Sequence, residues 1–418
     1  MSFKTHFKYL YRLLLAGSVL VIIGINRSYG QSSSKKGIGY KIVPQPDLWY
    51  NSVDGVRFGV RLKGEVPGTF GDGPHRLNLG IWGGSKFPND PVSYYMTFTE
   101  PIKSLSNFGS EANVQFKSSI RTGYDDHGIS FQKRWQIGFD NANYRNIRFS
   151  LSAQKLVNTR YRLFPFLWSR DWLTLATVTF QTNNKNGLGK YRYELMFKTG
   201  LPVKTDFFEH FTGSFEQSIK IGSGFVFHGR FFTGISSEKV PLQMEFNRSL
   251  ASPIDWLDNG FSRARGTIPP VWLKEGWLQI AGGPSLRGYT KQDMAEFFAK
   301  RKDLNPNFSS LNLEMDYPNP LDKALKKIPV LGDLVSMRSY LFMDSGSALQ
   351  FSNNPLIEKV EADAGPGFAA SISIPDNKGH MRSVVLRYDV PLWLSHPGAG
   401  NNPFAFRNIV GISTIINL

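Results

Sequence analysis

The chain has 418 residues, of which 41% are hydrophobic, 14% aromatic and 20% charged. This composition excludes an intrinsically disordered protein, which would contain far fewer aromatic residues. The formal net charge is +16 and there is no cysteine, so disulfide frameworks, thiolate metal sites and cysteine nucleophiles are excluded as well.

The first thirty residues have the features of a secretory signal peptide. Three basic residues precede an apolar run of 13 residues, from Leu13 to Ile25. This run is too short to cross the hydrocarbon core of a bilayer as a helix, but its length is typical of a signal-peptide core. We therefore expect residues 1–30 to be a signal peptide that is cleaved near Gly30. An anchor helix that stays attached is the alternative.

Residues 31–50 form, on this interpretation, a short periplasmic segment before a single domain at residues 51–418. From Val56 onward, almost every stretch between turn signals alternates apolar and polar residues, which is the pattern of half-buried β-strands. Clear examples are found at 56–62, 76–82, 146–154, 190–198 and 383–392. The segments 100–120 and 127–137 are ambiguous.

Alternating strands occur in soluble sandwiches and in membrane barrels, and three features favour a barrel. The chain begins with a secretory signal, the polar strand faces carry both charge signs, and the apolar faces are rich in Phe, Tyr and Leu. Aromatic residues also lie near the expected strand ends: Tyr94, Tyr95, Trp135, Trp172 and Trp393. Because backbone groups cannot stay unpaired in lipid, such a sheet must close.

A strand that crosses a bilayer needs about 9–11 residues, so the chain has room for about 16 strands. We therefore predict an all-β fold, a transmembrane antiparallel β-barrel in the outer membrane of a Gram-negative bacterium.

Three segments depart from the strand pattern. Residues 237–276 contain proline and tryptophan and are expected to form a long loop. Residues 290–303 have a helical pattern and continue that loop. Residues 319–336 are weakly amphipathic, and they either lie against the inner membrane–water interface or form a simple long turn.

Motifs in the second half of the chain resemble those of a known family. Residues 281–289 read Ala-Gly-Gly-Pro-Ser-Leu-Arg-Gly-Tyr. They are followed by Glu314-Met-Asp-Tyr-Pro318, Phe342-Met-Asp344-Ser-Gly346, Ala364-Gly-Pro-Gly367 and Val385-Leu-Arg-Tyr-Asp-Val-Pro-Leu392. In order and spacing over residues 223–418, these motifs are similar to those of the BamA-type outer-membrane assembly superfamily, also called the bacterial surface antigen family.

The resemblance implies a long loop folded into the lumen, with its tip at Arg287 paired to the inner wall. The alternation independently points Glu314, Phe342 and Asp344 inward. A planar guanidinium bridges two carboxylates and keeps its proton. The candidate loop latch is Arg287, Gly288, Tyr289, Glu314, Phe342 and Asp344, with Gly288 allowing a tight turn and Tyr289 or Phe342 packing on the guanidinium. The alternative is that Arg287 only fixes the loop.

A second candidate site is a lateral seam between the first and last strands. We expect the first strand near Val56–Leu62 and the last near Asn408–Ile416, with Val56, Phe58, Gly59, Gly411 and Ile412 as seam residues. Glycines weaken local strand pairing, and an imperfect seam offers unpaired backbone groups to an incoming strand.

The chain departs from the family in two ways. Family members usually carry periplasmic POTRA modules, but residues 31–50 are too few for one compact module. We therefore expect a short form without POTRA modules. The family also typically ends in an aromatic residue, whereas this chain ends Ile-Asn-Leu418.

The expected function is the insertion of outer-membrane proteins or lipids, or a role as a subunit of an outer-membrane complex. The alternative is a structural scaffold barrel or a gated pore without insertase activity. Outer-membrane lipids, client outer-membrane proteins, an accessory periplasmic protein and a second copy of the chain are possible partners; nucleic acid is not.

We expect no enzymatic activity, no cofactor and no metal. The sequence has no G-x-S-x-G motif and no histidine pair with metal-ligand spacing. Asp125-Asp126-His127 is the remaining acid–base candidate. We expect it in an outer loop, where such a group is usually only solvated.

Overall fold

The computed structural model describes residues 40–65, 75–87, 92–136, 143–202, 206–300, 304–329, 331–351, 357, 359–375, 381–398 and 400–416. The predicted signal peptide and residues 31–39 lie outside this part of the chain, so cleavage near Gly30 stays a prediction. None of the helices in the described residues has the length and apolar character that a membrane crossing requires.

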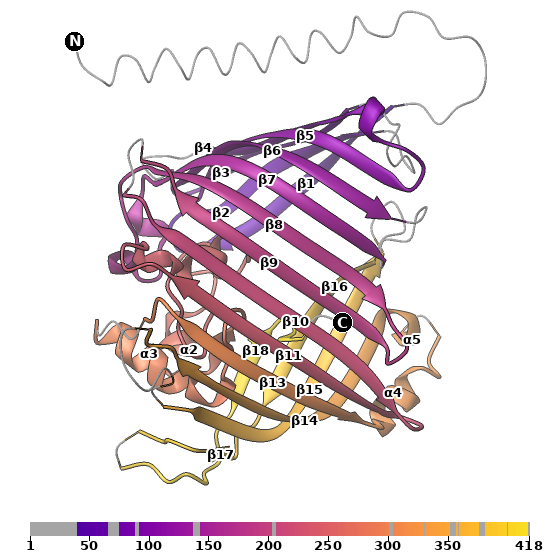
Figure 1. The fold of residues 1–418 in the computed structure, drawn as a ribbon, viewed down its shortest axis with the longest axis vertical. Helices are drawn as coiled ribbons and strands as arrows, with labels where there is room; N and C mark the ends of the chain where they lie inside the picture. Colours follow the sequence, from indigo (N-terminus) through magenta and orange to yellow (C-terminus); the bar gives the residue numbers. More distant parts are fainter. Residues whose placement is uncertain are drawn as a thin grey trace, which may run out of the picture. The chain divides into compact units, whose positions relative to one another are not determined.

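The described strands are joined in one 18-stranded sheet (Figure 1). The first half contains β1 (Lys41–Asn51), β2 (Gly55–Glu65), β3 (Arg76–Gly84), β4 (Val92–Pro101), β5 (Ser110–Arg121), β6 (Tyr124–Gln136), β7 (Tyr144–Leu156), β8 (Leu173–Lys185) and β9 (Lys190–Gly200). The second half contains β10 (Glu209–Ile221), β11 (Phe225–Ser236), β12 (Leu278–Ile280), β13 (Phe308–Tyr317), β14 (Val335–Ala348), β15 (Glu361–Pro375), β16 (Met381–Asp389), β17 (Trp393–Leu394) and β18 (Ile409–Ile412).

The wall of the barrel follows chain order. Each wall strand from β1 to β11 pairs antiparallel with the next, β11 pairs with β13, and the series continues through β14 and β15 to β16 and β18. β17 continues the line of β16 along β15, and β12 belongs to the long loop. The wall therefore has 16 strands in the described residues, which agrees with the predicted number of about 16, and the fold is an antiparallel β-barrel.

The barrel begins earlier than predicted. β1 pairs with β2 from Lys41 to Asn51, so the sheet starts ten residues before residue 51, and Val56–Leu62 belongs to the second strand. Pro44 and Pro46 hide this strand in the sequence, because proline is unusual in strands except at an edge. The ambiguous segments are also resolved, since both are largely strand, in β5 and β6.

The two faces of the wall differ as a membrane barrel requires. On β14, Leu341 and Met343 are exposed on the outside, whereas Phe342 and Asp344 are buried on the inside. Large apolar side chains are exposed in the same way on the other wall strands, including Phe58, Ile81, Phe116, Phe149, Leu195, Phe215, Phe231, Leu311 and Leu386. Exposed apolar area on this scale is stable only against lipid.

Short helices occupy the connections. One end of the barrel carries η2 (Thr159–Tyr161), η3 (Pro165–Leu167), η4 (Leu242–Met244), η5 (Pro253–Leu257), α2 (Pro270–Lys274), η6 (Arg287–Tyr289) and α3 (Thr290–Phe298); η1 (Lys103–Leu105), α4 (Pro320–Leu325) and α5 (Leu331–Leu334) lie at the other. The expected helix at 290–303 is present as α3, which ends at Phe298, and residues 301–303 lie outside the described residues. The turn at 319–336 contains α4 and α5.

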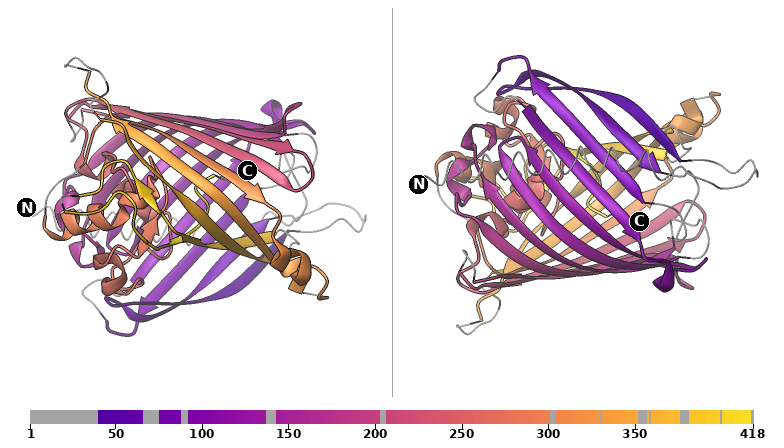
Figure 2. Two further views of the ribbon diagram at one scale, coloured as in Figure 1. Left: turned by 90° about the horizontal axis from the view of Figure 1, so that it is seen from below. Right: turned by 90° about the horizontal axis from the view of Figure 1, so that it is seen from above.

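The long loop between β11 and β13 folds into the lumen. Figure 2 shows its helices inside the curve of the sheet. Its buried side chains pack with those of the β7–β8 loop in one apolar cluster that includes Phe164, Trp168, Trp256, Leu273 and Phe297. The loop is therefore a packed plug with its own core.

Candidate functional site

The tip of the infolded loop is held against β13 by its backbone. Gly283 has a φ of +58°, a conformation that favours glycine, and it begins the turn that leads to Pro284. The carbonyl of Pro284 accepts hydrogen bonds from Ser310 Oγ (2.9 Å) and Asn312 Nδ2 (3.3 Å). Both donors are lumen-facing residues of β13, so the tip is fixed before Arg287 is reached.

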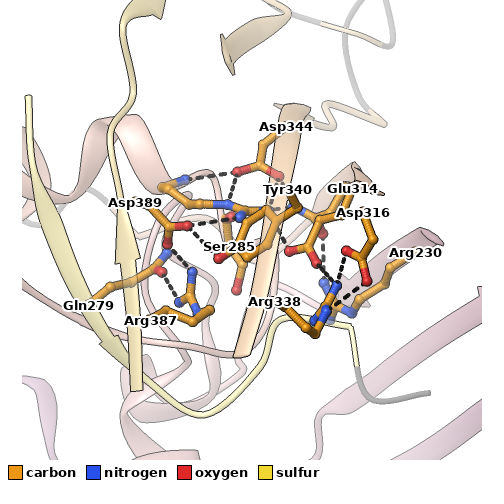
Figure 3. Close-up of polar contacts among 12 residues, drawn as sticks. Arg230, Gln279, Ser285, Glu314, Asp316, Arg338, Tyr340, Asp344, Arg387 and Asp389 are labelled. Atoms are coloured by element: carbon orange, nitrogen blue, oxygen red, sulfur yellow. Dashed lines mark hydrogen bonds and ion pairs between the residues drawn. The ribbon is translucent and has the colours of Figure 1, made fainter. Parts of the chain in front are cut away.

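Arg287 is completely buried and meets three carboxylates from three wall strands. Figure 3 labels these carboxylates, Glu314, Asp344 and Asp389. Its Nε donates to Asp344 Oδ2 at 2.8 Å and its Nη2 to Asp344 Oδ1 at 3.1 Å, in a bidentate pair. Nη2 also forms an ion pair of 3.0 Å with Glu314 Oε1. Nη1 donates to Asp389 Oδ1 at 3.3 Å. We call Arg287, Glu314, Asp344 and Asp389 the lumen latch.

The carboxylates decide the charge state of the latch. Burial alone would lower the pKa of Arg287, but Asp344, Asp389 and Glu314 outweigh it and raise the pKa well above its usual value. The guanidinium is therefore charged at every physiological pH. Deprotonation of the arginine therefore does not break these ion pairs.

The two aromatic candidates have different roles. The guanidinium of Arg287 lies over Phe342, 4.0 Å from the ring centre. Tyr289 lies under Arg248 instead, at 4.8 Å, and its hydroxyl donates to the Ala362 carbonyl at 3.2 Å. Phe342 therefore stacks on Arg287, whereas Tyr289 anchors the next turn of the loop.

Gly288 is required because the wall is so close. A Cβ atom at this position would lie 2.8 Å from Asp363 Cβ and 3.3 Å from a side-chain carbon of Leu394. The loop can approach β15 this closely only with glycine at residue 288.

The structure adds residues that the motif comparison did not single out. Asp389 is shared between Arg287 and Arg387, its neighbour on the same face of β16. Arg387 also donates to Gln279 Oε1 (2.7 Å) and to the Ser413 carbonyl (2.9 Å). The alternation of β16 already placed Arg387 and Asp389 on one face, and that was the available signal.

Arg248 provides a second anchor for the loop. It bonds to Asp293 of α3 at 2.6 Å and to Glu361 of β15 at 2.8 Å. The sequence carried no pattern that would identify this residue, because Arg248 lies in an irregular segment and its partners are 45 and 113 residues away.

The predicted seam residues are not all at the seam. Val56, Phe58 and Gly59 lie on β2, which pairs with β1 on one side and β3 on the other, so this part of the prediction is wrong. The first strand at the seam is β1. Gly411 and Ile412 do lie on the last strand, β18, and a Cβ at Gly411 would collide with the guanidinium of Arg387.

The seam itself is open in the described residues. There β1 forms a ladder with β2, and β18 forms ladders with β16 and with β12 of the infolded loop; no ladder joins β1 to β16 or β18. Within the part of the chain that the structure describes, these two wall edges are therefore not paired with each other.

The sequence analysis predicted the wrong location for the acid–base candidate. Asp125, Asp126 and His127 lie on β6 and not in a loop. Successive strand residues face opposite sides, so Asp126, in an ion pair with Lys117, and His127, whose Nδ1 lies 3.0 Å from Ser118 Oγ, point apart. In the described residues, no cluster of three or more His, Asp or Glu is arranged to hold a metal ion.

The wall has an apolar outer face, a charged inner face and a ladder that follows chain order. The chain is a β-barrel of the outer-membrane type. No protein-family model and no curated protein matches it.

Several solved structures are similar in fold. BamA from Haemophilus ducreyi lacking POTRA domains 1–3 is 15% identical, with a TM-score of 0.48, over 91% of this chain and 71% of that chain. CdiB from Escherichia coli is 12% identical, with a TM-score of 0.42, over 91% of this chain and 63% of that chain. A bacterial polysaccharide outer membrane secretin is 10% identical, with a TM-score of 0.36, over 84% of this chain and 90% of that chain.

Proposed function

We propose that this protein is an outer-membrane assembly or translocation barrel, which inserts outer-membrane proteins or lipids or serves as a subunit of a complex that does. The observation that carries the proposal is the seam between β1 and β18, which is open in the described residues and lies beside a latched, infolded loop. The motifs of residues 281–392, which resemble those of BamA-type assembly factors, support the same function.

The mechanism follows from the chemistry of a sheet edge. Unpaired N–H and C=O groups in lipid are costly, and each extended segment that pairs with them removes that cost. An open wall edge can therefore template a client strand by β-strand addition. The proposal gives no catalytic role to Asp126 or His127, which face opposite sides of β6.

A tether across the seam tests this function. Leu48→Cys on β1 and Val410→Cys on β18 would be joined by bis-maleimide linkers of increasing length in a chain that has no other cysteine. The shortest linkers should lower the amounts of other outer-membrane proteins and slow growth of the host. The control joins Leu48→Cys to Phe58→Cys, register partners in the existing β1–β2 ladder, and should have no effect. An unchanged outer-membrane proteome with the seam tethered would contradict the assembly function.

A gated pore or scaffold barrel without insertase activity is the second candidate. It is favoured by the packing of the loop, beside which separate cavities remain, one of about 330 Å³ between β9–β11 and the loop and one of about 640 Å³ between β14–β16 and the loop. Single-channel recording and native mass measurement after gentle extraction distinguish the two. A scaffold predicts a stable complex or dimer, and a gated pore predicts large conductance steps when the latch is removed.

A further inference from the structure

The two edges at the open seam differ in the backbone hydrogen-bonding groups that they present. For β1, the register with β2 determines which groups these are. Val56 on β2 donates its N–H to Ser85 Oγ (3.0 Å), and its carbonyl accepts from the Ser85 N–H (2.9 Å). Both groups of Val56 therefore point toward the β3 side. Its register partner Tyr50 must then point its own N–H and carbonyl away from β2, toward the seam.

Every second residue of β1 faces the seam in the same way. The residues whose backbone groups point toward the seam are Ile42, Pro44, Pro46, Leu48 and Tyr50. Two of these five are prolines and have no N–H to donate. The carbonyl of Tyr50 is already in contact with Thr267 Oγ1 of the loop, at 3.4 Å. The middle of the β1 edge thus lacks the donors that a regular antiparallel ladder needs.

The edge of β18 has no proline, and it is occupied. Leu278, Gln279 and Ile280 of β12 pair parallel with Val410, Gly411 and Ile412. The Val410 N–H donates to the Trp277 carbonyl at 2.6 Å. The occupying strand comes from the infolded loop, not from the wall.

The side chains of β12 fit this position closely. Leu278 and Ile280 are buried in the apolar cluster of the loop, and Gln279 between them accepts from Arg387 Nη2 at 2.7 Å. Arg387 in turn shares Asp389 with Arg287. The position therefore selects an apolar–polar–apolar strand, and it is connected through two arginines to the lumen latch.

We propose that β12 is a resident strand that holds the place of an incoming extended segment on the edge of β18, and that the lumen latch keeps it there. The segment that replaces it has the same chemistry, with a hydrogen-bonding residue between two apolar ones. β1, with Pro44 and Pro46, is the edge that does not template. This inference rests on the proposed function and specifies which strand receives the client.

Peptide trapping tests the inference without requiring assembly activity. The probe is a synthetic peptide with the sequence of residues 276–283 and cysteine in place of Leu278. It is offered under mild oxidation to Val410→Cys and to Leu48→Cys proteins, each with and without Arg287→Ala, in lipid vesicles. A shift of the folded barrel on unheated gels shows that each variant is folded. Gln279→Ala, which removes the Arg387 contact but keeps the latch, serves as a second loosened variant should Arg287→Ala not fold.

We expect the peptide to be trapped several-fold more by Val410→Cys when the latch is removed, and little by Leu48→Cys in either background. Equal or stronger trapping at Leu48→Cys would overturn the proposal, as would an absence of trapping at Val410→Cys in a folded, loosened variant. Trapping at Val410→Cys together with a harmless seam tether would leave this inference standing and would contradict the assembly function alone.

Discussion

At the scale of single residues, the lumen latch is a network of buried ion pairs, and the loss of Arg287 from it is expected to destabilise the folded barrel. Arg287 is fully buried among Glu314, Asp344 and Asp389, which are themselves buried. Removing the arginine leaves Asp344 without a cation, whereas Glu314 keeps Arg338 and Asp389 keeps Arg387. The energetic cost comes mainly from the buried charge left at Asp344, and less from the lost attraction.

Arg287→Ala should therefore lower the free energy of unfolding by about 3–5 kcal/mol. The folded barrel should lose heat stability on gels, and its conductance in planar bilayers should rise because the loop is released. Arg170→Ala, at an exposed loop position, is the matched control and should change neither. Normal melting and normal conductance of Arg287→Ala would show that the latch does not hold the loop.

Gly288→Ala tests the close approach separately from charge. The added methyl group would lie 2.8 Å from Asp363 Cβ, and overpacking of this kind costs about 1–3 kcal/mol. Gly187→Ala is the control, because a Cβ there meets nothing within 4 Å. We expect lower heat stability and higher conductance for residue 288 only. Equal behaviour of the two variants would mean that the loop tip is not seated against β15.

At the scale of secondary-structure elements, the seam depends on which backbone donors the edge strands present. Prolines at two positions whose backbone groups point toward the seam keep β1 from pairing with other edges. This is a known way of protecting an exposed strand. β18 is protected differently, by β12. One edge is thus blocked by its own prolines, and the other is covered by a strand of the infolded loop.

Replacing Pro44 and Pro46 by threonine should restore two donors to the β1 edge. An edge with a full set of donors associates with other edges, so we expect dimers in native mass spectra of gently extracted protein. Gln45→Thr is the control, because the backbone of residue 45 faces β2 and the substitution adds no donor to the seam. A double variant with the same mass distribution as the unaltered protein would refute the blocking role of the prolines.

At the scale of the whole molecule, the apolar exterior makes the barrel a membrane protein. Leu341 is 55% exposed on the wall and Leu188 is 60% exposed in the β8–β9 turn. In a soluble sandwich the two positions would respond alike to a charge. In a lipid-facing wall, a charge is costly at Leu341 but not at Leu188.

Leu341→Arg should therefore destabilise the barrel by about 2–4 kcal/mol near the bilayer centre, whereas Leu188→Arg should be nearly neutral. Urea unfolding in lipid vesicles measures both. Similar small effects at the two positions would be incompatible with a lipid-facing outer wall.

Much of this architecture could be read from the chain. Strand alternation with both charge signs on one face favours a closed wall with a polar interior. The period of two assigns each residue to a face without knowledge of its neighbours. The same parity placed Glu314, Phe342 and Asp344 inward, and the family motif indicated that Arg287 would meet them.

Only the tertiary structure decided which strands form the edges and which groups complete the latch. Pro44 and Pro46 concealed β1, because a strand that tolerates proline is recognisable as an edge only once its partner is known. Asp389 and Arg248 obtain their roles from partners more than 40 residues away. The pairing of β12 with β18 likewise joins segments that no local pattern connects. Parity along a strand is a local property of the backbone, whereas closure depends on contacts between distant parts of the chain.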